Sequence, residues 1–316
     1  MKILVTPTSF QPGKGNPELE RLQAFCPDLV FNETGKPLAG EDLIQRLQGC
    51  DGYIAGLDFI TAEVLRACPG LKVISRYGVG YDRVDRAAAA EAGITVTNTP
   101  GVNAEAVGEL AVAMMLSVAR RVPYLDRQTR EGAWIRSTGM ELRGKTVGIL
   151  GLGAIGKVVA RCCAGIGMTV TAYDPYINAD YCAEHKIAIK TLEEVLTESD
   201  VISLHLPLTE ETNHMIDGAA IAKMRDGAIV INTSRGGIVD EAAAAEALRS
   251  GKLGGLGLDA FEQEPPTGSP LFDLPNVVVT PHTGAHTREA TENMARMAVD
   301  NLIAELSGQD CGHRVR

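Results

Sequence analysis

The sequence of 316 residues predicts an α/β protein with two doubly wound parallel-sheet domains. Short β-branched runs alternate with longer segments of helical periodicity along the chain. Near-continuous apolar runs of this kind are typical of parallel strands covered on both faces. The runs form two series on either side of a Pro–Gly segment near residue 100, and the length fits two domains of about 150 residues.

The first series of predicted strands lies in the first hundred residues: Lys2–Thr6, Gly52–Ala55, Lys72–Ser75 and Ile94–Thr97. The second series is Thr146–Leu150, Thr169–Tyr173, Val201–Leu204, Ala228–Asn232, Gly257–Asp259 and Val277–Thr280. Thr99–Asn103 reads as a hinge between the series because Pro and Gly break regular structure. A last helix near 287–306 is expected to return to the first domain. We therefore expect a domain of residues 1–100 plus 288–316, and a second of 101–287.

A predicted helix, about Ala104–Arg120, follows the hinge. Its apolar residues extend beyond one stripe, so we expect burial on more than one side. The buried surface would face either a partner subunit or the space between the two domains.

Composition excludes several classes of protein. The net charge of −10, without a basic run, argues against binding nucleic acid or an anionic membrane. No apolar run approaches the roughly 18 to 20 residues that cross a bilayer, and Met1–Thr6 does not resemble a secretory signal. Seven cysteines without a CxxC pair indicate reduced thiols, and no spacing resembles a metal site. We expect a cytoplasmic protein without a metal.

A glycine loop follows the predicted strand Thr146–Leu150, with the sequence Gly151-Leu152-Gly153-Ala154-Ile155-Gly156. Gly151 permits a tight turn, Gly153 allows close approach of a pyrophosphate, and Gly156 allows a helix to pack closely on the strand. The N-terminus of the following helix offers unpaired N–H groups to phosphates. The loop predicts a dinucleotide site, and a glycine-rich turn without a ligand is the alternative.

Asp174 ends the next predicted strand, 18 residues after Gly156. Its carboxylate is placed to accept hydrogen bonds from a ribose diol and would repel a 2′-phosphate, which favours NAD over NADP. The stretch also approaches a phosphate-binding NTPase loop, but Val158 stands where the magnesium-binding hydroxyl is needed.

Three charged or titratable side chains follow successive predicted strands in the second half: Arg235, Glu264 and His282. Each alone is commonly a solvated loop residue. Together, beside a dinucleotide fold, they supply an anion anchor, a carboxylate and an acid/base at the sheet edge where ligands bind. Arg235 can hold a planar carboxylate through two parallel hydrogen bonds, and a carboxylate beside His282 keeps its proton available.

The chain resembles the D-isomer-specific 2-hydroxyacid dehydrogenases. The motifs are the glycine loop, His205–Thr209, Asn232–Gly237, Asp259–Glu262 and Pro281–Gly284, and Tyr77–Asp82 looks most like the phosphoglycerate dehydrogenase branch. The resemblance implies a flavodoxin-like substrate domain, a Rossmann NAD-binding domain and a homodimer formed through the helix near 104–120. It also implies His282 as acid/base, Glu264 as its partner and Arg235 as the residue that holds the substrate.

The resemblance implies further contacts with NAD: Gly151, Gly153, Ala154, Ile155, Gly156, Asp174, Leu206, Thr212, Thr233, Asp259 and Gly284. Of these, Asp259 would accept a hydrogen bond from the nicotinamide carboxamide. Backbone N–H groups of Gly78, Val79 and Gly80 would bind the substrate anion from the first domain, so that the active site would lie in the interdomain cleft. Among the other histidines, we interpret His205 as lining the cofactor cleft and His286 as capping the last helix; His185, His214 and His313 are expected to be exposed.

The substrate is less clearly indicated. Arg76 matches a basic position of the phosphoglycerate branch, and Arg136 is placed to contribute across a dimer, which slightly favours 3-phosphoglycerate. Glu91-Ala92 stands where a further basic residue of that branch is expected, which argues against phosphate recognition. Glyoxylate or hydroxypyruvate reduction is the nearest alternative, and an unusual sugar acid is also open. The chain ends soon after its last predicted helix, so a regulatory domain with serine feedback is not expected.

A different class of function is also open. Some proteins of this fold bind NAD(H) and act as dinucleotide-sensing interaction modules such as corepressors. Turnover of a small 2-oxoacid separates an enzyme from such a module.

Overall fold

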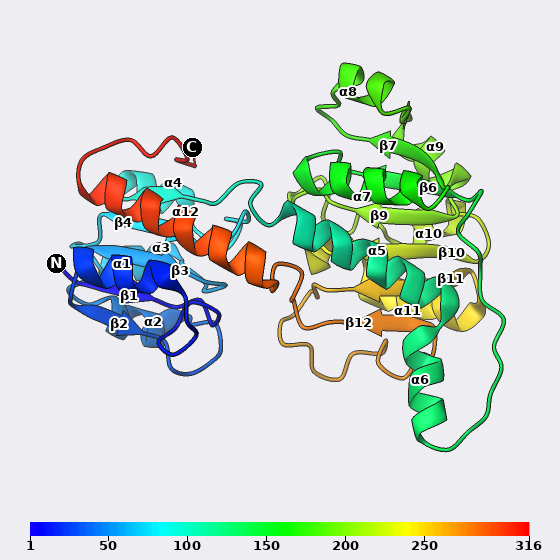
Figure 1. The fold of residues 1–316 in the computed structure, drawn as a ribbon, viewed down its shortest axis with the longest axis horizontal. Coiled ribbons are helices and arrows are strands. Elements are labelled where there is room, and N and C mark those ends of the chain that lie inside the picture. The colour runs from blue at the N-terminus through cyan, green and yellow to red at the C-terminus, as the bar shows by residue number, and fades with distance from the viewer. Residues whose placement is uncertain (316) are drawn as a thin grey trace. The chain divides into compact units, whose positions relative to one another are not determined.

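The computed structural model describes residues 1–315, which divide into two compact units (Figure 1). Unit 1 comprises Met1–Asn103 and the described residues from His286 onward, and unit 2 is Ala104–Ala285. The chain thus passes from one unit to the other after residue 103 and after residue 285. The boundaries predicted from the sequence lay after residues 100 and 287. Each unit contains one parallel sheet, which confirms the predicted fold class.

Unit 1 is a five-stranded parallel sheet in the order β2-β1-β3-β4-β5. Helices α1 and α12 pack together on one face, and α2, α3 and α4 form the other layer (Figure 1). The strands are β1 (Ile3–Val5), β2 (Leu29–Phe31), β3 (Gly52–Ala55), β4 (Val73–Arg76) and β5 (Thr95–Thr97). The helices are α1 (Pro17–Phe25), α2 (Gly40–Leu47), α3 (Ala62–Ala67), α4 (Arg86–Glu91) and α12 (Arg288–Leu306).

Unit 2 is a seven-stranded parallel sheet in the order β12-β11-β10-β9-β6-β7-β8. Chain order reverses between β6 and β9, which is the switch point where open α/β sheets bind ligands. The strands are β6 (Thr146–Leu150), β7 (Thr169–Tyr173), β8 (Ala188–Ile189), β9 (Val201–Leu204), β10 (Ala228–Asn232), β11 (Leu253–Leu258) and β12 (Val277–Val279). The helices are α5 (Ala104–Arg120), α6 (Val122–Arg130), α7 (Ala154–Gly165), α8 (Ala179–Glu184), α9 (Leu192–Glu198), α10 (Gly218–Lys223), the 3₁₀ turn η1 (Gly236–Ile238) and α11 (Glu241–Ser250).

Strands β2, β8 and β11 differ most from the sequence prediction, and several others differ by one residue at an end. Strands β2 and β8 were not predicted; both are short edge strands, and β8 has only two residues, both exposed. Strand β11 begins at Leu253 rather than Gly257, because its glycines serve packing and not a turn. A Cβ on Gly255 would lie 2.3 Å from Cγ1 of Val118 in α5, so the helix packs directly on the strand backbone.

Helix α5 buries one face within unit 2, against β10, β11 and α7. Met114, Met115 and Val118 are buried there, and a Cβ on Gly108 would lie 2.5 Å from Val158 of α7. Leu116, on the same helix, is 41% exposed. The unit's own sheet and α7 therefore account for the burial of this face.

Helix α12 belongs to unit 1, as expected from the sequence. Ser75 Oγ donates to the carbonyl oxygen of Ala298 at 2.9 Å, and Asn301 Nδ2 donates to that of Asn98 at 2.9 Å. The helix is capped by Thr287, whose hydroxyl accepts the Ala290 N–H at 3.1 Å. The expectation that His286 caps this helix was therefore wrong. None of the helices in the described part of the chain combines the length and apolarity of a membrane span.

Candidate active site

The glycine loop joins β6 to α7 in unit 2, and two of its glycines, Gly151 and Gly156, are required by close backbone contacts. Gly151 has φ of +99°, and a Cβ there would lie 2.8 Å from the carbonyl carbon of His205. A Cβ on Gly156 would lie 2.1 Å from the carbonyl oxygen of Gly151, whereas one on Gly153 would meet nothing within 4 Å. Gly153 is the N-cap of α7 and supplies no side chain, so the helix N-terminus presents its N–H groups to an anion.

Asp174 follows β7 and lies beside this loop. One carboxylate oxygen accepts the Leu152 N–H at 2.7 Å, and the other accepts the Tyr176 N–H at 2.8 Å. These bonds orient the carboxylate, and each oxygen keeps a lone pair for a ribose hydroxyl. The geometry fits the adenosine half of a dinucleotide.

The segment after β9 lies against Gly151 at the switch point. His205 is half-buried, its Nδ1 atom is buried, and its Nε2 lies 2.9 Å from Ser203 Oγ. Desolvation of the ring lowers its pKa to about 3. The ring is therefore neutral at physiological pH. Leu206 and Thr212 are buried in the same segment, where Thr212 Oγ1 donates to the Pro207 carbonyl oxygen at 2.6 Å. Of the histidines expected to be exposed, His185 and His214 are, whereas His313 is half-buried and contacts Asn301 Oδ1 at 3.0 Å.

Arg235 lies in the loop after β10, and the buried Asn232 shapes that loop. Asn232 Nδ2 donates to the Arg235 carbonyl oxygen at 2.7 Å, and its Oδ1 accepts the Ser234 N–H at 3.0 Å. A Cβ on Gly236 would lie 1.8 Å from the Phe261 carbonyl carbon, so the loops after β10 and β11 touch through their backbones. The half-buried Arg235 side chain is thereby held near the loop that carries Glu264.

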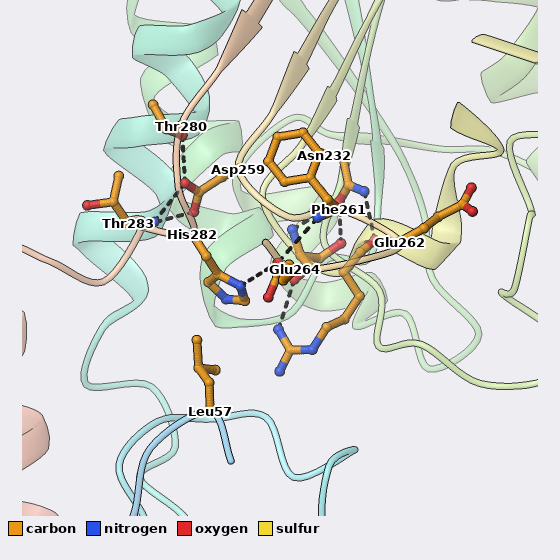
Figure 2. Close-up of polar contacts among 12 residues, drawn as sticks. Leu57, Asn232, Asp259, Phe261, Glu262, Glu264, Thr280, His282 and Thr283 are labelled. Atoms are coloured by element: carbon orange, nitrogen blue, oxygen red, sulfur yellow. Dashed lines mark hydrogen bonds and ion pairs between the residues drawn. The ribbon is translucent and has the colours of Figure 1, made fainter. Parts of the chain in front are cut away.

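Glu264 and His282 form a direct pair (Figure 2). His282 Nδ1 lies 2.8 Å from Glu264 Oε1, which also accepts the Phe261 N–H at 3.2 Å. With Nδ1 engaged, Nε2 is the ring nitrogen that can exchange a proton with a substrate. His282 has φ of +51°, a left-handed conformation that costs a non-glycine residue on the order of 1 kcal/mol.

The remaining predicted cofactor residues lie near this pair. Asp259, just after β11, is buried and accepts hydrogen bonds from Thr280, Thr283 and Gly284. Thr233 is buried, and its hydroxyl has no hydrogen-bond partner among the described residues. A buried hydroxyl without a partner is costly, so it is a candidate contact for a bound cofactor that reaches it.

The predicted anion loop of unit 1 is held by side chains beneath it. Arg76 is 2% exposed; its Nε donates to the Gly80 carbonyl oxygen at 3.1 Å and its Nη1 to that of Ala55 at 2.8 Å. Asn98 Nδ2 donates to the Val79 carbonyl oxygen at 2.8 Å, and Gly78 accepts the Thr99 N–H at 3.1 Å. The carbonyl oxygens of Gly78, Val79 and Gly80 are thus all engaged within the unit.

The supporting roles of Asn232 and Ser203 were not predicted from the sequence. Asn232 leaves a signal, since an Asn at a strand end followed by Thr-Ser favours a turn closed by its own side chain. Ser203 leaves none, because its contact with His205 depends on how the strand end is buried.

Fold and site together define a class: a dinucleotide-binding oxidoreductase whose sheet edge carries an arginine, a carboxylate and an imidazole. Residues 112–284 match the family described as D-isomer specific 2-hydroxyacid dehydrogenase, NAD binding domain. The chain is 42% identical to a glyoxylate reductase of Korarchaeum cryptofilum, over 98% of this chain and 94% of that protein. The chain belongs to the D-isomer specific 2-hydroxyacid dehydrogenases, which are NAD-dependent oxidoreductases acting on CH–OH groups.

Two further similarities bear on cofactor and substrate. A D-3-phosphoglycerate dehydrogenase of Archaeoglobus fulgidus is 44% identical over 79% of this chain, and the chain spans about half (48%) of that protein's length. A D-lactate dehydrogenase of Aquifex aeolicus, solved with NAD and lactic acid, is 31% identical with a TM-score of 0.88 and covers 99% of both chains. The predicted NAD cofactor is confirmed by the family match, and the relatives include more than one substrate specificity.

Proposed function

We propose that this enzyme interconverts a D-2-hydroxyacid and its 2-oxoacid, with His282 as acid/base and Glu264 as its partner. The contact of 2.8 Å between His282 Nδ1 and Glu264 Oε1 carries the proposal, because it leaves Nε2 to face a substrate. A bound nicotinamide would supply the hydride for the carbonyl carbon during reduction and would accept it during oxidation. His282 donates the proton to the carbonyl oxygen during reduction and takes it back during oxidation.

Arg235 is proposed to hold the substrate carboxylate. Its backbone is fixed by Asn232, the residue is half-buried, and its Nη1 donates to the Ser234 carbonyl oxygen at 2.8 Å, so a bidentate contact requires little further ordering. We further propose that N–H groups of Gly78, Val79 and Gly80 bind the same anion, since the carbonyl side of that loop is already occupied. Unit 1 would then be the substrate domain.

The proposed cofactor contacts follow the geometry of unit 2. The N-terminus of α7 with Gly153, Ala154 and Ile155 would hold the pyrophosphate, and Asp174 the adenosine ribose. The other proposed contacts are Gly151, Gly156, Leu206, Thr212, Thr233, Asp259 and Gly284.

We propose glyoxylate or hydroxypyruvate as the substrate, ahead of the 3-phosphoglycerate pair that the sequence slightly favoured. A phosphorylated substrate was predicted from Arg76 and from a contribution of Arg136 across a dimer, and Arg76 was the main cation. Its guanidinium is buried and donates to Ala55 and Gly80, so its role is to support the anion loop. The full-length similarity to a glyoxylate reductase supports the same choice.

A panel of 2-oxoacids, followed by absorbance of the reduced nicotinamide, tests the proposal. Glyoxylate and hydroxypyruvate are expected to show kcat/KM at least about 10-fold above 3-phosphohydroxypyruvate. In Arg76→Ala, KM is expected to rise alike for all substrates, because the loop is disturbed. A rise confined to the phosphorylated substrate would restore the phosphoglycerate assignment, and preference for NADPH would contradict the role of Asp174.

We also propose that the enzyme is a homodimer formed through unit 2. Large apolar side chains are exposed along α5, α6 and the segment that follows: Leu116 at 41%, Val122 at 53%, Trp134 at 85% and Ile135 at 44%. Helix α6 has no buried residue and projects from the end of α5 away from the sheet (Figure 1). Light scattering is expected to give a dimer for the wild type and a monomer for Leu116→Glu; a monomeric wild type would contradict this proposal.

A further inference from the structure

The loop that carries His282 is anchored by one buried carboxylate. Asp259 Oδ1 accepts the Thr280 hydroxyl at 2.6 Å and the Thr283 N–H at 2.8 Å, and Oδ2 accepts the Gly284 N–H at 2.8 Å. Figure 2 shows Asp259 between Thr280 and Thr283, with His282 in the loop between them. The Asp259 carboxylate therefore binds residues on both sides of His282 in the sequence, and we call these three hydrogen bonds the Asp259 bracket.

The bracketed loop needs such an anchor. His282 has φ of +51°, and its own N–H donates to Thr280 two residues earlier at 3.0 Å. A left-handed histidine persists only where its surroundings hold it. Gly284 fits closely, since a Cβ there would lie 3.0 Å from Asp259 Oδ2 and 3.4 Å from Val107.

We infer that Asp259 is a positioning residue that sets the orientation of His282 through the Thr280–Gly284 loop, in addition to any contact it makes with the nicotinamide. The inference rests on the proposed role of His282 as acid/base. Asp259 is 2% exposed and already accepts three protein donors. Its carboxylate thus already makes three hydrogen bonds to the Thr280–Gly284 loop without a bound cofactor.

Kinetics of Thr280 variants separate this role from cofactor binding. Thr280→Val removes one hydrogen bond of the bracket and leaves the carboxylate intact. We expect kcat for 2-oxoacid reduction to fall about 10-fold, since small misplacements of a catalytic group are costly. The Kd for NADH should stay within about 2-fold, and Thr280→Ser, which keeps the hydroxyl, should recover most of kcat. Wild-type kcat in Thr280→Val would overturn the inference.

The matched control is Thr171→Val, which removes a hydroxyl that donates to the Val147 carbonyl oxygen at 3.3 Å within the sheet. This variant should keep wild-type kcat. Asp259→Asn provides the second kinetic arm: kcat at saturating NADH should fall about 10- to 100-fold. A variant that only binds NADH more weakly, with kcat retained at saturation, would assign Asp259 to the cofactor alone and overturn the inference.

Amide hydrogen exchange tests the hydrogen bonds of the Asp259 bracket directly, without substrate or cofactor. In Asp259→Asn, the amides of Thr283 and Gly284 should exchange at least about 10-fold faster, while those of α7 keep their wild-type rates. Unchanged exchange at Thr283 and Gly284 would overturn the inference whether or not the enzyme turns over. A wild type that reduces no 2-oxoacid would instead contradict the proposed function and leave the exchange result to stand by itself.

Discussion

The carbonyl oxygen of Gly151 lies directly against Gly156, where a Cβ would meet it at 2.1 Å. The contact brings the first turn of α7 onto the end of β6, with no side chain between them. Close backbone packing of this kind gives the glycine loop its shape and aims the helix N-terminus at the pyrophosphate site.

Gly156→Ala is therefore expected to destabilise the protein and to weaken NADH binding together. Overpacking a tight backbone contact costs about 1–3 kcal/mol, and thermal unfolding should show the loss as a lower Tm. Gly153→Ala is the matched control for stability, since a Cβ there meets nothing within 4 Å. It should keep the wild-type Tm while weakening NADH binding, and an equal loss of Tm in both variants would contradict the prediction.

Glu264→Gln should lower kcat for reduction about 100-fold with little change in NADH affinity. The amide keeps the size of the side chain but removes the charge that stabilises the imidazolium of His282. Steady-state kinetics and a separate NADH titration provide the measurement. Glu262→Gln is the control, because Glu262 contacts Glu241 and His214; comparable losses in both variants would remove the special role of Glu264.

Asp174→Ala should raise the Kd for NADH about 10- to 100-fold, because hydrogen bonds to a charged acceptor contribute about 1.5–3 kcal/mol each. The Kd for NADPH should change less, since the carboxylate that repels a 2′-phosphate is gone. Fluorescence titration with both cofactors measures the ratio. Asp180→Ala, which removes a similar charge from the exposed first turn of α8, should leave both constants unchanged.

His205 should make stability fall as the solution becomes acidic. Burial lowers its pKa to about 3 from the ordinary value of 6.5, so below pH 6.5 the unfolded chain gains a proton that the folded protein does not. This contribution is fully present above pH 6.5 and is lost progressively as pH falls toward 3. By pH 5 the loss amounts to about 2 kcal/mol.

Urea unfolding of the wild type and of His205→Gln at pH 7.5 and pH 5 tests this expectation. The variant lacks the titrating ring, so its free energy of unfolding should fall less between the two conditions. An identical fall in both proteins would show that the ring is already free to take a proton in the folded state.

Much of the fold could be predicted because its signals are local. Apolar runs marked most strands, and the glycine loop together with Asp174 indicated a dinucleotide site from adjacent residues alone. Arg235, Glu264 and His282 could be grouped because residues after parallel strands share one edge of a sheet. The contact between Glu264 and His282 follows from that grouping, although no sequence pattern gives its distance.

Only the tertiary structure decided what the longer-range partners do. Arg76 matched a phosphate-binding position, but its guanidinium lies beneath the anion loop because β3 presents the Ala55 carbonyl oxygen beside it. Asp259 anchors the His282 loop because β12 pairs with β11 in parallel, which brings Thr280 to the carboxylate. Hydrophobic periodicity and turn formation are determined by residues that are neighbours in the sequence, so both could be predicted. The partner of a buried charge depends instead on which strands pair and on how segments distant in sequence pack together.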